Sequence, residues 1–295
     1  MATLYTHQSE NITKTWLLLT LFFIGVIAIG WGISWYYGNP GILYIAVAFA
    51  LVMNVWSYWF SDSLVIKMTG AKPMPDSGSY QDVHNLVENL AITAGLPKPK
   101  LYLIDDPAPN AFATGRNKEH AAVAVTTGLL SMMERQELEG VLAHELSHVG
   151  NRDMLVSTVA VVLAGVIAIL SDMFLRMAMF GGDRDRNAGP LVAVIIIAAA
   201  VLAPIAATLI RLAISRKREY LADASGALLT RYPEGLASAL RKIGSYAAPM
   251  KKANHATAHL FLSNPFGARA TNGFFNTLFM THPPIEARVK ALLGR

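Results

Sequence analysis

The sequence predicts a mainly α-helical integral membrane protein with four transmembrane helices and a cytoplasmic α+β domain that contains a small sheet. Hydrophobic residues make up 53% of the 295 residues and charged residues only 15%, whereas soluble domains carry about 25% charged residues. The excess lies in four uncharged stretches, each near the ~18–20 residues that a helix needs to cross a bilayer. These stretches are Trp16–Tyr37, Gly41–Phe60, Met154–Ser171 and Leu191–Ile210.

The first two stretches form the clearer hairpin. Only Gly38-Asn39-Pro40 separates them, and tryptophan and tyrosine gather near their ends, as in the aromatic belts of membrane interfaces. A cleaved signal peptide is excluded because the first stretch is too long and leads directly into another span. The second pair flanks a polar loop at 176–190. Its first member is short, so a buried hairpin is the alternative to two further crossings.

Lysine and arginine indicate the orientation of the spans. The 38–40 turn has none, and the 176–190 loop offsets its arginines with Asp183 and Asp185. The opposite ends are flanked by Lys67, Lys72, Arg152, Arg211, Arg216, Lys217 and Arg218. We therefore predict that these ends are cytoplasmic. The net charge of +5 is spread along these flanks without a dense basic patch, which predicts no nucleic-acid partner.

The most informative motif is His144-Glu145-Leu146-Ser147-His148. Residues four apart share one face of a helix, and 136–149 has apolar residues at helical spacing and no proline. Both imidazoles could therefore bind one zinc ion, while Glu145 activates water as a general base. The alternative is a surface helix that carries two solvated histidines by chance.

Two histidines leave zinc under-coordinated, so a third protein ligand is needed. Glu219 is our candidate, and Asp223, four residues later, would accept the free N–H of a ligand histidine and fix its tautomer. The alternative is a solvated helix whose acids are balanced by 216–218. Because the chain has no cysteine, its metal ligands must be histidine and carboxylate, which suits a catalytic zinc site.

Shorter patterns outline the rest of the cytoplasmic domain. Asp82–Ala94 reads as an amphipathic helix, Lys100–Ile104 and Ala121–Val125 as strands, and Thr126–Gly128 as a turn. Asn110–Thr114 is expected to form an exposed edge strand above the zinc, where a substrate backbone could pair, or else an ordinary sheet strand.

Two further histidine motifs stand outside this scheme. His255 and His259 repeat the four-residue spacing without a glutamate, so ordinary helix or loop residues are favoured over a second metal site. His282 lies in Thr-His-Pro-Pro, before a short helix near Pro284, and its role stays open.

In combination, four motifs resemble the HtpX family of membrane-bound zinc metalloproteases, bacterial and archaeal relatives of the CAAX prenyl proteases. They are the H-E-L-S-H motif, Glu219-Tyr220-Leu221-Ala222-Asp223, Asn110-Ala111-Phe112-Ala113-Thr114-Gly115 and Thr281-His282-Pro283-Pro284. The resemblance covers nearly the whole chain. It implies a zincin-type domain with one zinc per chain, substrate binding at Asn110 and Ala111, and an active site on the cytoplasmic side of the cell (inner) membrane. It also implies protein substrates in the lipid bilayer, namely misfolded or damaged membrane proteins degraded under stress.

The expected layout divides the protease domain around a membrane insertion. Residues 1–60 hold an N-terminal tail and the first hairpin (spans 16–37 and 41–60), and 154–211 hold the second (154–175 and 191–211). Residues 61–153 and 212–295 then form the two parts of the protease domain. The sequence is compatible with two other functions. A processing protease of the CAAX type would have more spans, and a non-enzymatic zinc-binding membrane scaffold would have no use for Glu145 beside an open metal position.

Overall fold

The computed structural model describes residues 4–180, 215–252, 257–267 and 283–294. The chain forms two compact units. The first unit contains Met1–Ile12, Asp62–Thr158 and Ile214–Arg295, and the second contains Thr13–Ser61 and Val159–Ala213. The predicted second member of the second hairpin (191–211) and its preceding loop lie outside the described residues.

The second unit contains most of two long helices, α1 (Leu4–Tyr37) and α2 (Gly41–Thr69). They are joined by a tight turn in which Gly38 adopts a left-handed conformation (φ 61°) and the Asn39 side chain accepts a bond from the Gly41 N–H at 2.9 Å. The Asn54 amide donates to the Leu19 carbonyl oxygen at 3.2 Å. This bond ties the two helices together in a region with few polar groups.

Three helices among the described residues are long and apolar enough to cross a membrane: Ser9–Tyr37, Gly41–Thr69 and Asp153–Asp172. Each extends beyond the stretch predicted from hydropathy. Hydropathy marks the apolar part of a helix, and the backbone bonds of the same helix continue into flanking polar residues. The third belongs to α6 (Asp153–Phe180), which begins in the first unit and enters the second at Val159.

The first unit contains a four-stranded mixed sheet with the order β1-β2-β4-β3. The strands are β1 (Lys72–Pro73), β2 (Lys100–Ile104), β3 (Ala111–Thr114) and β4 (Ala122–Thr126). Strands β2 and β4 are parallel, and the β1–β2 and β3–β4 pairs are antiparallel. Strand β3 therefore lies at one edge of the described sheet.

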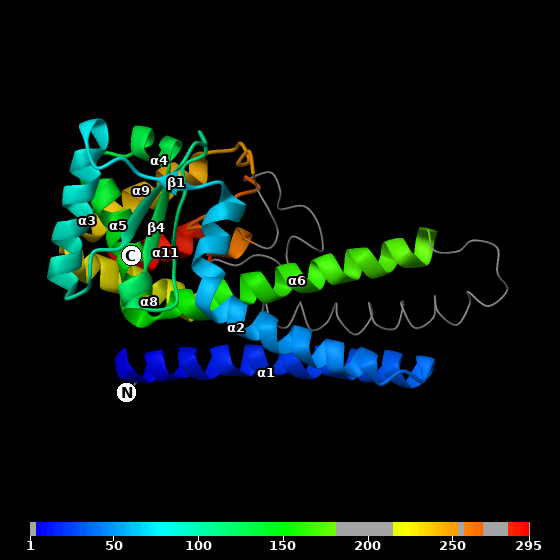
Figure 1. Ribbon diagram of the computed structural model, residues 1–295. Coiled ribbons are helices and arrows are strands. Elements are labelled where there is room, and N and C mark those ends of the chain that lie inside the picture. The colour runs from blue at the N-terminus through cyan, green and yellow to red at the C-terminus, as the bar shows by residue number, and fades with distance from the viewer. Residues whose placement is uncertain (1–3, 181–214, 253–256, 268–282, 295) are drawn as a thin grey trace. The chain divides into compact units, whose positions relative to one another are not determined.

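Helices of the first unit lie beside this sheet and pack mainly on one another (Figure 1). They are α3 (Gln81–Ala94), α4 (Thr127–Met132), α5 (Arg135–Asn151), α8 (Arg216–Thr230), α9 (Pro233–Ser245) and α11 (Ile285–Leu293). The predicted turn after the strand at 121–125 is wrong. Thr126–Gly128 is not a simple turn, because the Thr126 hydroxyl accepts a bond from the Leu129 N–H and caps α4.

Helix α5 is the central element of the first unit, in contact with α3, α8, α9 and β3. A capping box of Glu134 and Glu137 fixes its start. Its apolar residues Val141, Leu142, Leu146 and Val149 are almost fully buried. At its other end Arg152 adopts a left-handed conformation (φ 58°) and turns the chain directly into α6.

Candidate metal centre

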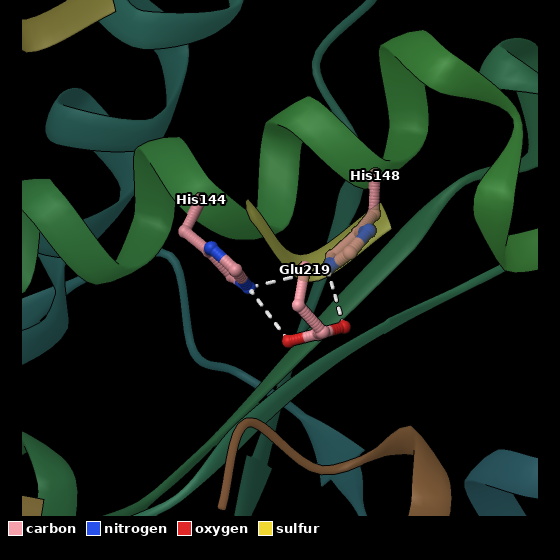
Figure 2. Close-up of side chains that lie close together, drawn as sticks. All are labelled: His144, His148 and Glu219. Atoms are coloured by element: carbon pink, nitrogen blue, oxygen red, sulfur yellow. Dashed lines mark hydrogen bonds and ion pairs between the residues drawn. The ribbon is translucent and has the colours of Figure 1, made fainter. Parts of the chain in front are cut away.

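Three side chains from two helices converge in the first unit. His144 and His148 project from one face of α5, and Glu219 approaches both from α8 (Figure 2). Each residue offers one ligand atom, and these atoms all lie within 4.8 Å of one another. No other group of three or more such residues occurs in the part of the chain that the structure describes.

The two imidazoles face each other through their Nε2 atoms, which are 3.1 Å apart. Glu219 Oε2 lies 3.8 Å from Nε2 of His144, and Oε1 lies 3.6 Å from Nε2 of His148. Two ring nitrogens so close must either share a hydrogen in a hydrogen bond or bind the same metal ion. Tetrahedral zinc with bonds of about 2.0–2.1 Å places two ligand nitrogens roughly 3.3 Å apart, so the residues fit a metal.

Each histidine is held by an aspartate through its other ring nitrogen. Nδ1 of His144 lies 2.9 Å from Asp223 Oδ1, which is the contact expected from the sequence. Nδ1 of His148 lies 3.1 Å from Oδ2 of Asp153, the first residue of α6. A ring that donates from Nδ1 presents the Nε2 lone pair to a metal. Both rings are thus oriented as ligands.

Arg288 supports the aspartate on the His144 side and is fully buried. Its Nε and one terminal nitrogen donate to the two oxygens of Asp223 at 2.8 and 2.7 Å. Burial alone would raise the pKa of Asp223, but the bonds from Arg288 and His144 lower it to about 2. Asp223 is therefore ionised at neutral pH, in contact with Nδ1 of His144. Burial, the largest influence, holds the pKa of His144 itself below its usual value.

The environments of His148 and Glu145 shift both pKa values upward. Burial opposes the charge on His148, yet the bond to Asp153 and the negative charges of Glu219, Asp153 and Glu145 raise its pKa to about 9. Burial raises the pKa of Glu145 to about 7, although the backbone N–H of Ala113 donates to its carboxylate. Glu145 is therefore poised to exchange a proton near neutral pH.

The close packing of α8 on α5 brings Glu219 and Asp223 to the histidines. Gly226 lies against the α5 backbone, where a Cβ atom on residue 226 would be 2.9 Å from the backbone nitrogen of His144. Only glycine permits this approach. Since Glu219, Asp223 and Gly226 lie on successive turns of α8, this contact sets how closely their helix approaches His144.

Comparison with known families decides the identity. Residues 78–295 match the model of Peptidase family M48, a span that contains all the residues of this centre. The chain belongs to peptidase family M48. It is therefore a metalloprotease, and its apolar helices make it a membrane protein.

Relatives of this M48 peptidase are similar over nearly their full lengths. A Protease HtpX homolog of Caldanaerobacter subterraneus subsp. tengcongensis is 48% identical over 298 residues, which cover 98% of this chain and 97% of the relative. A second, from Pyrococcus furiosus, is 49% identical over 279 residues and 93% of each chain. The family resemblance predicted from the motifs is confirmed.

A solved structure, that of S. mikatae Ste24p, shows the same fold. It has a TM-score of 0.51 and 17% identity to this M48 peptidase. The match covers 95% of this chain but 62% of the other, so this chain spans less than two thirds of that protein. The likeness supports a mainly helical architecture with a small mixed sheet.

The edge strand of this M48 peptidase differs from the prediction. Strand β3 lies at the sheet edge, but all its residues are buried, so the prediction of an exposed edge is wrong. The Leu262 N–H donates to the Ala111 carbonyl at 2.9 Å. The Asn110 amide bonds both the N–H and the carbonyl of Ser263, at 3.1 and 3.0 Å. A segment about 150 residues further along the chain thus covers this part of the edge.

Sequence reasoning missed two residues of this centre, Asp153 and Arg288. The signal for Asp153 was a carboxylate five residues after His148, at a helix junction. Arg288 lies within the short helix expected near Pro284, but nothing in that helix indicated Asp223 as its partner. His255 and His282 lie outside the described residues. His259 is buried, with Nε2 3.5 Å from the Ser157 carbonyl.

Proposed function

We propose that this metalloprotease is a single-zinc endopeptidase in which His144, His148 and Glu219 hold the metal. The observation that carries the proposal is the convergence of two imidazole nitrogens and one carboxylate, with each ring held by an aspartate. Three protein donors leave a coordination position for the reaction, as in catalytic zinc sites. When bound, zinc supplies a Lewis acid that polarises a peptide carbonyl and lowers the pKa of water.

Glu145 serves as the general base and acid in this proposal. It takes a proton from the attacking water and returns it to the leaving amine. Its raised pKa of about 7 suits both transfers. The Ala113 N–H fixes the Glu145 carboxylate in place. Because Glu145 follows His144 directly in the sequence, its carboxylate lies near the metal without being a ligand.

Substrate is proposed to bind along β3 at Asn110 and Ala111. Antiparallel pairing points alternate backbone groups away from the neighbouring strand, and the bond from Leu262 shows that the Ala111 carbonyl faces outward from the sheet. A substrate backbone could accept the same pairing once Leu262 and Ser263 move aside. Main-chain bonds of this kind grip a substrate with little sequence preference.

We further propose four spans and an active site on the cytoplasmic side of the cell (inner) membrane. Support comes from the three candidate membrane helices, the basic residues that flank their ends and the HtpX relatives. The layout is then a hairpin in 1–60, a second in 154–211, and a protease domain of 61–153 and 212–295. The proposed role is quality control, in which misfolded or damaged membrane proteins are cleaved under stress. Broad backbone recognition favours this role over specific processing of the CAAX type.

Metal analysis and casein cleavage with purified full-length protein in detergent test the chemistry. Glu145→Gln should abolish cleavage and keep about one zinc per chain, because the base is not a ligand. Glu219→Ala should lose both zinc and cleavage. Glu139→Gln, the same change on the same helix, is the matched control and should behave as wild type. Wild-type cleavage by Glu145→Gln would refute the mechanism, and wild-type zinc affinity in Glu219→Ala would refute the ligand set.

Fusion reporters test the membrane topology. A reporter after Arg295 should be cytoplasmic, and one inserted near Asn187 should be on the opposite side of the membrane. Both reporters on one side would show that the second hairpin does not cross twice.

A further inference from the structure

Asn11, near the start of α1, makes a set of contacts close to the metal centre. It lies outside the 78–295 segment that matches the peptidase family, yet it belongs to the same compact unit and is only 3% exposed. Its Nδ2 donates to Asp153 Oδ1 at 2.6 Å and to the Asn151 carbonyl at 3.2 Å. Its Oδ1 accepts a bond from Arg218 at 3.4 Å. The amide thus bridges a buried carboxylate and a buried guanidinium.

The two oxygens of Asp153 have different partners. Oδ2 lies 3.1 Å from Nδ1 of His148, whereas Oδ1 accepts the short bond from Asn11. The nearest cation, Nε of Arg218, is 3.6 Å from Oδ1. The Asn11 bond is the shortest of these contacts, and it holds Oδ1 while the other oxygen of the same carboxylate faces His148.

We propose that Asn11 is a positioning residue for the metal ligand His148 and acts through Asp153. This inference rests on the proposed zinc role of His148. A ring held from Nδ1 keeps its Nε2 directed at the metal only while the acceptor itself is held. Asn11 holds that acceptor from the first helix, and it lies near the start of the candidate membrane span Ser9–Tyr37. The metal centre is thereby linked to the N-terminal helix as well as to the peptidase helices.

A role in helix packing alone would account for fewer of these contacts. The bond to the Asn151 carbonyl would suffice to anchor α1 at the end of α5. Instead the same nitrogen also bonds the carboxylate that holds His148, and the amide oxygen bonds its counter-ion. A buried asparagine satisfied on both sides by charged groups has one orientation, which is what a positioning role requires.

The test uses full-length protein in detergent and two probes, zinc and cobalt(II). Zinc affinity is measured by chelator competition, and the visible bands of bound cobalt report the coordination geometry. Asn11→Ala should weaken zinc about 3–10-fold, less than the ~10–100-fold typical of a residue that touches the ligand, and should alter the cobalt bands. Asn54→Ala is the matched control. It removes an amide bond within the α1–α2 hairpin, to the Leu19 carbonyl, and should leave zinc and cobalt binding unchanged.

A double variant separates positioning from packing. If Asn11 acts through Asp153, the combination of Asn11→Ala and Asp153→Asn should bind zinc no more weakly than Asp153→Asn alone. Additive losses would overturn the proposal, and so would wild-type zinc and cobalt binding by Asn11→Ala. Should Asn11→Ala fail to fold, Asn11→Ser retains a small polar group and carries the same expectations. Wild-type zinc affinity in His148→Ala would instead refute the proposed ligand set itself, whatever Asn11 does.

Discussion

The two histidines of the candidate metal centre are supported in parallel ways by different parts of the chain. On each side an aspartate accepts from Nδ1 and an arginine approaches the aspartate. On the His144 side, Asp223 is bonded by Arg288 through two short hydrogen bonds, and both residues follow the active-site helix in sequence. On the His148 side, Arg218 lies 3.6 Å from Asp153 and Asn11 makes the short bond.

This difference separates a rigid support from an adjustable one. A bidentate, fully buried guanidinium fixes the plane of Asp223 within the peptidase segment itself. Asp153 depends on a single neutral amide from the first helix and on a more distant charge. The pKa values of the two histidines also differ. Burial lowers the pKa of His144, while the acids around His148 raise the pKa of that ring to about 9. The two sides should therefore respond differently to substitution and to pH.

The largest expected difference is between the two arginines. Arg288→Ala leaves Asp223 as a buried carboxylate without its bidentate partner, and the loss of one member of a buried pair costs about 3–5 kcal/mol. Arg218 is buried too, but its Nε lies 3.6 Å from Asp153, which Asn11 also holds, so a smaller loss is expected for Arg218→Ala than for Arg288→Ala. Thermal and SDS-induced unfolding in detergent would measure both. Equal losses would contradict the difference between the two supports.

The residues that the sequence could reveal are those whose partners are local. His144, Glu145 and His148 share a helix whose periodicity is visible, and Glu219 and Asp223 share another. Asn11, in contrast, is 142 residues from Asp153, and Arg288 is 144 residues from His144. No local pattern predicts such pairs. The position of Asp153 also depends on the left-handed turn at Arg152, which most sequence signals would assign to glycine or asparagine.

The same limit explains which parts of the fold were predicted. The strand Lys100–Ile104 and the amphipathic helix ending at Ala94 follow from local alternation and periodicity, and both are observed. The cover over the β3 edge is not local, since Leu262 pairs with Ala111 across 151 residues of sequence. Helix α2 continues to Thr69, past the predicted span end at Phe60 and the charged residues Asp62 and Lys67, because a helix does not end where its hydropathy falls.

The next prediction concerns the close approach that the His144 side requires. In Gly226→Ala the new Cβ would lie 2.9 Å from the backbone nitrogen of His144. Helix α8 must therefore move away from α5 and carry Glu219 and Asp223 with it. A cost of about 1–3 kcal/mol, together with weaker zinc binding, is expected. Gly150→Ala on α5 is the control, because its Cβ would meet only Leu96, at 3.8 Å. Unfolding and zinc titration of both variants check this, and equal behaviour would contradict it.

A smaller effect is expected from neutralising each aspartate. Asp223→Asn and Asp153→Asn keep the shape of the side chain but remove the charge that makes the histidine a better donor to the metal. Each should weaken zinc about 10–100-fold without abolishing it. Asp223→Asn should also destabilise the metal-free protein, because it removes the charge partner of the buried Arg288. Zinc titration and unfolding of the metal-free protein would distinguish the two variants. Complete loss of zinc binding in either variant would contradict a purely orienting role for that aspartate.

The smallest expected effect is a pH dependence of zinc affinity that arises from His148. In the metal-free protein the bond to Asp153 and the surrounding acids outweigh burial and raise the pKa of His148 from 6.5 to about 9. The proton therefore stabilises the metal-free fold fully below pH 6.5, and this stabilisation is lost as the pH rises through about 9. Zinc must displace that proton, so zinc affinity should rise about tenfold per pH unit between roughly pH 6.5 and 8.

Substitution of the two aspartates assigns this proton to its histidine. Asp153→Asn should flatten the pH slope of zinc affinity, because it removes the group whose hydrogen bond and charge raise the pKa of His148. Asp223→Asn should weaken binding at every pH with the slope unchanged, since the pKa of His144 is already lowered and no proton has to leave that ring. Chelator competition at four or more pH values would measure both slopes. A slope that flattens only in Asp223→Asn would show that the displaced proton belongs to His144.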